Sequence, residues 1–116
     1  MEHIDAIRDE LRGPARELRA AIPDVLAGFA DLAKAAMADG ALSTGVKELL
    51  ALVIAATREC DGCVASHARS AVRAGVTLEQ VAEAMGVVIM MNGGPGTVWG
   101  PRVLAAFDQA LEAQRA

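Results

Sequence analysis

Residues 48–67, ELLALVIAATRECDGCVASH, place a carboxylate, two cysteines and a histidine in one short stretch. Cys60 and Cys63 are the only cysteines of the chain, and His67 is one of its two histidines. Two thiols separated by two residues can close a small disulfide ring. A histidine one helical turn after the second thiol can exchange a proton with that thiol. The stretch therefore predicts redox chemistry on a helix.

A helix start at the cysteines would favour the thiolate form that this chemistry needs. We expect Asp61 to be the N-cap of a helix that runs from Gly62 to Ala74 and ends in a left-handed C-cap at Gly75. Cys63 then lies in the first turn, where unpaired backbone N–H groups and the helix dipole stabilise negative charge. The position therefore favours an ionised Cys63.

The preceding segment predicts a second helix, capped by Ser43 or Thr44 and continuing to about Arg58. Its expected core-facing side consists of Val46, Leu49, Leu50, Val53 and Ile54. If this helix and the cysteine-bearing helix form an antiparallel hairpin, Glu48 comes within about one turn of His67. The carboxylate could then orient the imidazole and relay protons.

The rest of the chain also has helical periodicity. Residues 4–19 predict one kinked helix or two short ones, because a Gly-Pro pair interrupts the apolar spacing. Residues 23–38 predict an amphipathic helix, and residues 77–91 predict a helix that begins with a capping box. A turn is expected at 93–96, followed by a last helix at about 98–114.

Composition agrees with a helical protein. Hydrophobic residues make up 53% of the 116 residues and aromatic residues only 3%, so Ala, Leu, Val, Ile and Met must form the core. Ala, Leu and Met favour helix, and no segment shows the alternation of a strand. We therefore predict an all-α, antiparallel bundle of about five to seven helices in a single domain, residues 1–116. A domain of this size often gains stability by association.

Charge and hydropathy exclude several classes. The net charge of -4 offers no clustered Lys and Arg for nucleic acid. The longest mainly apolar stretch, Leu49–Thr57, is shorter than the roughly 20 residues that span a bilayer, and the N-terminus has no signal-peptide pattern. We expect a cytoplasmic protein without nucleic-acid or membrane partners. A static disulfide is disfavoured there, so the cysteine pair is catalytic, metal-binding or incidental.

Glu48, eleven residues, Cys60-x-x-Cys63, three residues and His67 together resemble the signature of the alkylhydroperoxidase AhpD-like family, within the carboxymuconolactone decarboxylase-like superfamily. The resemblance covers roughly residues 22–112 and leaves residues 1–21 as an N-terminal helical extension. It implies an all-helical fold and a homo-oligomer, either a trimer or a hexamer.

The resemblance also implies a role for each site residue. Cys63 would attack a hydroperoxide and become a sulfenic acid, and Cys60 would resolve it to a disulfide. His67 and Glu48 would form the proton relay. No bound cofactor or metal is expected, and an external dithiol such as dihydrolipoamide or a lipoyl protein, a possible redox partner, would return the electrons. Several family members place a histidine directly before the second cysteine, where this chain has Gly62, so its relay is one group shorter.

Other interpretations use the same residues. The site could exchange disulfides with proteins, and a thioredoxin-like analogy would make Cys60 the nucleophile. A carboxymuconolactone decarboxylase-like lyase would use His67 as a base and would not need the thiols. A non-enzymatic metal-binding or assembly module would use Cys60, Cys63, His67 and Glu48 as zinc ligands.

Large apolar side chains outside this stretch have two interpretations. Met85, Met90 and Met91 are expected to fill the core or a subunit interface. Trp99 and Phe107 are expected to pack in the core or to line a substrate pocket.

Overall fold

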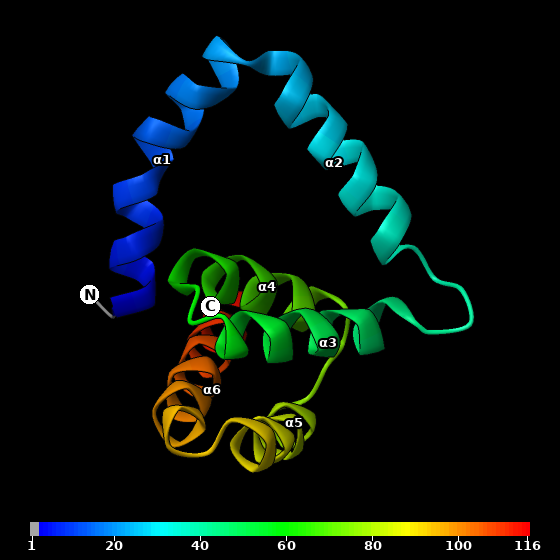
Figure 1. The fold of residues 1–116 in the computed structure, drawn as a ribbon, viewed down its shortest axis with the longest axis vertical. Helices are drawn as coiled ribbons and strands as arrows, with labels where there is room; N and C mark the ends of the chain where they lie inside the picture. The colour runs from blue at the N-terminus through cyan, green and yellow to red at the C-terminus, as the bar shows by residue number, and fades with distance from the viewer. Residues whose placement is uncertain (1–2) are drawn as a thin grey trace.

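The computed structural model describes residues 3–116, which form six helices and no strand (Figure 1). The helices are α1 (His3–Ala21), α2 (Pro23–Met37), α3 (Thr44–Thr57), α4 (Asp61–Arg73), α5 (Leu78–Asn92) and α6 (Gly94–Arg115). The predicted all-α class, the single domain and the range of helix number are confirmed. Within residues 3–116, every helix is too short or too polar to cross a lipid bilayer.

The core lies among α3, α4, α5 and α6. Helix α6 packs against the other three, and α3 packs against both α4 and α5. The largest fully buried side chains come from all four helices: Leu52, Val64, Val81, Val88, Val103 and Phe107. Phe107 is completely buried, so its predicted core position is confirmed. These contacts hold α3 and α4, which carry the site residues, in a fixed relation.

Helices α1 and α2 form an arch whose apex stands off this bundle, while α1 packs against α4 (Figure 1). Helix α1 continues through Pro14 as one helix, and its one buried residue is Ile4. Helix α2 starts with Pro23 at its first position, as predicted, but no residue of α2 is buried. Val25 and Phe29, on its apolar face, are 64% and 65% exposed. The apolar face of α2 is therefore exposed, and no other helix among residues 3–116 packs over it.

The orientation of α3 differs from the expectation. Its N-cap is Ser43, whose Oγ accepts a hydrogen bond from the Val46 N–H at 3.1 Å. The expected core residues Val46, Leu50 and Ile54 are 41–56% exposed. The buried residues are instead Glu48, Leu52, Ala55 and Ala56. Helix α3 is apolar on almost every side, so its sequence pattern does not distinguish the side that packs against α4 and α6.

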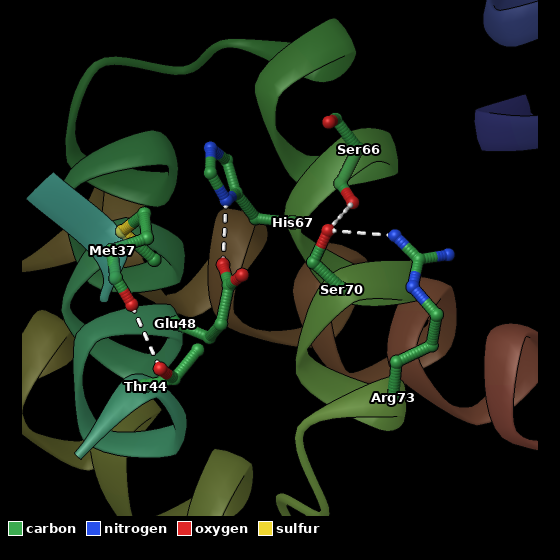
Figure 2. A network of polar contacts seen from close by, with 7 residues as sticks. All are labelled: Met37, Thr44, Glu48, Ser66, His67, Ser70 and Arg73. Carbon is green, nitrogen blue, oxygen red and sulfur yellow. Dashed lines mark hydrogen bonds and ion pairs between the residues drawn. The ribbon is translucent and has the colours of Figure 1, made fainter. Parts of the chain in front are cut away.

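Polar contacts hold the loop between α2 and α3. The Thr44 N–H donates to Asp39 Oδ1 at 2.8 Å, and this bond lowers the pKa of the Asp39 carboxyl. The Thr44 hydroxyl donates to the carbonyl of Met37 at 2.8 Å (Figure 2). These bonds connect the end of α2 to the start of α3.

The predicted turn chemistry is largely confirmed. Gly75 ends α4 with a φ of 84°, in the left-handed region that glycine tolerates best. Thr77 and Gln80 form the predicted capping box at the start of α5. The turn expected at 93–96 is shorter than predicted, because Gly93 alone makes the break and α6 begins at Gly94. Proline is tolerated in a first helical turn, so the following Gly-Pro-Gly joins α6.

Gly96 is required by the close approach of α6 to α5. A Cβ at this position would lie 2.8 Å from Ile89 Cα and 3.0 Å from the Val88 carbonyl oxygen. A Cβ at Gly86 of α5 would meet no atom within 4 Å. The two glycines therefore differ in packing although both are helical.

We predict opposite effects of alanine at these two positions. Gly96→Ala should lower the free energy of unfolding by about 1–3 kcal/mol, because backbone atoms of α5 must move. Gly86→Ala, the matched control, should raise it by up to about 1 kcal/mol through helix propensity. Urea unfolding followed by circular dichroism measures both. Equal effects of the two substitutions would contradict this account of the α5–α6 contact.

Candidate redox site

A tight connection between α3 and α4 brings the first cysteine to the start of α4. Glu59 has a φ of 54°, the one positive φ at a non-glycine residue among residues 3–116. The Cys60 N–H then donates to the Ala55 carbonyl at 3.0 Å, which turns the chain back against the end of α3. The two helices consequently run as a hairpin with the cysteines at its closed end.

Cys60, and not Asp61, is the N-cap of α4. Cys60 has an extended backbone, with φ of -103° and ψ of 97°, and its Sγ accepts a hydrogen bond from the Cys63 N–H at 3.2 Å. The two residues are joined by a disulfide, with their Cα atoms 5.3 Å apart. A cap at Cys60 places its sulfur beside the first turn, where Cys63 lies. Asp61 therefore begins the helix, which corrects the predicted cap by one residue.

The two sulfur-bearing residues differ in exposure. Cys63 is exposed, whereas Cys60 is half-buried. Cys63 also lies in the first turn of α4, as predicted, where the helix dipole favours an anion. A solvent-borne reagent thus reaches Cys63 more easily than Cys60.

Glu48 and His67 form the shortest polar contact of the site. Glu48 Oε1 lies 2.7 Å from His67 Nδ1, and Figure 2 shows the two side chains pointing toward each other from α3 and α4. Glu48 is only 5% exposed, while the His67 side chain is 34% exposed. The contact predicted from the hairpin is confirmed.

This contact determines which imidazole nitrogen is available for chemistry. An ionised carboxylate only accepts hydrogen bonds, so a hydrogen bond from His67 to an ionised Glu48 requires the proton on Nδ1. Nε2 then keeps its lone pair, and the second ring nitrogen points away from Glu48 in Figure 2. His67 follows Cys63 by four residues and shares its side of α4. The pair can therefore accept a proton on the side of α4 that carries Cys63.

Asp61, between the cysteines, joins three helices. Its Oδ2 lies 3.3 Å from His3 Nε2 of α1, and its Oδ1 lies 3.7 Å from Arg102 Nη1 of α6. Arg102 also stacks over the ring of Trp99, with its guanidinium carbon 4.7 Å from the ring centroid. The His3 side chain is itself 58% exposed. No local pattern indicates the two contacts of Asp61, because they join residues far apart in the sequence.

Position 62 faces α1. A Cβ at Gly62 would lie 3.6 Å from Leu11 Cδ1, which is an ordinary van der Waals distance. A larger side chain at this position would therefore meet α1.

The possible zinc ligands are engaged with one another. The cysteine sulfurs are bonded together, and Glu48 contacts His67. Within residues 3–116, no three His, Cys, Asp or Glu side chains are grouped so that they could share a metal ion.

Comparisons with a family model and with a solved structure agree on one protein family. The model of the Carboxymuconolactone decarboxylase family matches residues 23–112. An uncharacterized protein of Cupriavidus necator is 42% identical over 86 residues, which cover 74% of this chain and 76% of the relative. An uncharacterized protein encoded in the cox locus of Paracoccus denitrificans is 36% identical over 81 residues, covering 70% of this chain and 73% of that protein.

A solved structure has the same fold. The crystal structure of an apo carboxymuconolactone decarboxylase family protein from Legionella pneumophila matches with a TM-score of 0.90. The sequences are 31% identical, and the match covers 96% of this chain and 99% of the other. The arch of α1 and α2 is therefore largely included in the likeness.

The difference in exposure predicts different alkylation rates. After reduction with a phosphine, Cys63 should react with iodoacetamide at least about tenfold faster than Cys60, because Cys63 is exposed and lies in the first turn of α4. Quenched time points and peptide mass spectrometry would measure the two rates. Equal rates, or a faster Cys60, would contradict the assignment of Cys63 as the accessible thiol.

Proposed function

The chain belongs to the carboxymuconolactone decarboxylase family, and on that premise we propose that it is a thiol-dependent oxidoreductase that reduces hydroperoxides or protein disulfides. One observation carries the proposal. The Cys60–Cys63 disulfide lies at the start of α4, and His67, held by buried Glu48, follows one turn later. A lone cysteine pair would support a redox role less strongly, because buried cysteines also serve as small apolar residues.

In the peroxidase reaction, the Cys63 thiolate attacks one oxygen of the hydroperoxide. The S–O bond forms as the O–O bond breaks, so Cys63 becomes a sulfenic acid and the substrate leaves as an alcohol after taking a proton. Cys60 then attacks the sulfenate sulfur, which releases water and forms the disulfide. Thiols at positions 60 and 63 are close enough for this second step, because their Cα atoms are 5.3 Å apart.

An external dithiol completes the cycle. Its two thiols exchange with the Cys60–Cys63 disulfide, so the protein regains both thiols and the donor becomes a disulfide. Dihydrolipoamide, free or on a lipoyl protein, is the donor we propose. The same exchange run with a protein disulfide as oxidant would give the alternative activity. A cytoplasmic location, where such dithiols stay reduced, is part of this proposal.

His67 and Glu48 move the protons in this scheme. Nε2 accepts the proton of the attacking thiol and later returns it to the departing oxygen. Glu48 does not touch the reacting atoms in this scheme, so it is a positioning residue. Its buried carboxylate fixes the Nδ1–H tautomer and stabilises the imidazolium that forms.

A lyase is the second candidate, and the Glu48–His67 pair is the observation that favours it. This pair is held by contacts between α3 and α4 and needs no thiol. A histidine base acting on a lactone acid would therefore survive loss of both cysteines. The two candidates differ in whether a double Cys→Ser variant is active.

Cysteine variants test the roles in the redox proposal. With cumene hydroperoxide and dihydrolipoamide, Cys63→Ser should lose all turnover, whereas Cys60→Ser should accumulate a sulfenate that dimedone traps. Glu48→Gln should lower kcat by about 100-fold or more, because the imidazole loses its orienting charge. Glu59→Gln, on the exposed connection, is the matched control and should retain wild-type kcat. Alcohol release and mass spectrometry provide the two measurements.

Two results would reject this assignment. If both single cysteine variants turn over peroxide at the wild-type rate, the pair has no catalytic role. If the double Cys→Ser variant still converts a muconolactone-type acid while Glu48→Gln does not, the lyase is correct.

We also propose that the protein is a homo-oligomer, a trimer or a hexamer. The apolar side of α2, with Val25, Phe29 and Leu32, is uncovered, and a helix of this length is marginal without tertiary contacts. The same chain exposes Met90 and Met91 on α5 at 71% and 72%. The arch of one copy packing on α5 of the next would cover both surfaces, and such a head-to-tail contact forms a ring when the rotation between copies closes.

Light scattering after size-exclusion chromatography tests this assembly. Phe29→Glu should shift the protein to monomer, because it introduces a charge on the side of α2 that the neighbouring copy would cover. Lys34→Glu, on the opposite side of the same helix, is the matched control and should leave the mass unchanged. A wild-type protein that is monomeric at tens of micromolar would contradict the assembly.

A further inference from the structure

We propose that the cavity between α1, α4 and α6 binds a small organic carboxylate. Three arginines would bind its carboxylate group, and an apolar floor would contact its hydrocarbon part. The cavity has a volume of about 280 Å³. It is separate from the Glu48–His67 pair and independent of the redox proposal.

The sequence of α4 explains why the cavity and the redox residues are separate. Ala65, Arg69, Val72 and Arg73 recur at helical spacing and line the cavity. His67 lies on the other side of α4, where it contacts α3. In Figure 2, Arg73 lies on the far side of Ser70 from the Glu48–His67 contact, with its guanidinium beside the Ser70 hydroxyl.

Small side chains of α6 leave the space open. Ala106, Ala110 and Ala113 line the cavity where α6 approaches α4 and α1. Ile4, the one buried residue of α1, and Val72 complete an apolar surface. A ligand with a short hydrocarbon body can therefore cover apolar surface there.

The polar lining favours an anion. Arg8, Arg69 and Arg73 face the cavity with a single carboxylate, Asp5, so the lining carries a formal charge of +2. The whole chain, by contrast, has a net charge of -4. Guanidinium groups bind carboxylates through paired, charge-assisted hydrogen bonds.

Within residues 3–116, two of these guanidinium groups have no ionic partner. Asp5 contacts Arg8 at 3.3 Å, and Arg73 donates to the Ser70 hydroxyl at 3.1 Å. In the part of the chain that the structure describes, neither Arg69 nor Arg73 lies within ion-pair distance of a carboxylate. A bound carboxylate would supply that partner, and the apolar floor distinguishes an organic acid from a bare inorganic anion.

Titrations of the full chain with hexanoate, hexan-1-ol and inorganic phosphate test the site. Two-dimensional NMR of ¹⁵N-labelled protein should show hexanoate shifting the arginine Nε–H signals of the cavity in a saturable way. Hexan-1-ol and phosphate should each bind at least about tenfold more weakly, because one lacks the charge and the other lacks the apolar body. Added sodium chloride should weaken hexanoate binding.

Substitutions locate the binding. Arg69→Gln and Arg73→Gln should each weaken hexanoate binding by about tenfold. Arg16→Gln, on an exposed part of α1 outside the cavity, is the matched control and should bind as the wild type does. Ala110→Leu should also weaken binding by filling the floor, and it keeps the test available if an arginine variant does not fold.

Three outcomes would overturn the proposal. Equal affinity for hexanoate and hexan-1-ol would show that the carboxylate charge does not contribute to binding. Equal affinity for hexanoate and phosphate would show that the apolar floor does not contribute. Equal losses in Arg69→Gln and Arg16→Gln would show that binding reflects overall charge instead of this cavity. None of these measurements depends on turnover, so failure of the redox proposal is distinguishable from failure here.

Discussion

The buried carboxylate of Glu48 is the constraint on which the arrangement of the site depends. Among residues 3–116 it is the one charged side chain that is buried, at 5% exposure. Removing a carboxylate from water is unfavourable unless a partner compensates it, and His67 on α4 is that partner at 2.7 Å. The α3–α4 hairpin must therefore keep one register. That register also places Cys60 and Cys63 at its closed end, so the stability of the fold and the geometry of the thiols depend on the same contact.

Local features and spacing were sufficient to predict much of this structure. The capping box at Thr77, the left-handed Gly75 and the Glu48–His67 contact each follow from short-range patterns or from a simple hairpin. The buried side of α3 did not follow, because a helix that is apolar almost all round has no preferred side in its pattern. The contact of His3 with Asp61 was also hidden, since it joins residues 58 positions apart.

Helix α4 carries two unlike surfaces. One side carries the cysteine pair and His67, and the other carries Arg69 and Arg73 over an alanine-rich floor. Helix α1 reaches both regions, because His3 contacts Asp61 while its next turns line the cavity. It also faces Gly62, so a side chain at that position would contact Leu11 of α1. The arch is thus part of the surroundings of the site as well as an exposed apolar surface.

Besides forming the disulfide, the sulfur of Cys60 caps α4 by accepting a hydrogen bond from the Cys63 N–H. The residues preferred at helix N-caps are serine, threonine, aspartate and asparagine. A serine at position 60 would therefore keep the helix start while removing the partner thiol. Glu48 cannot be replaced in the same way, because its carboxylate both joins α3 to α4 and orients the His67 imidazole. In evolutionary terms, one substitution at position 60 would remove the disulfide while keeping the helix start of α4 and the Glu48–His67 contact.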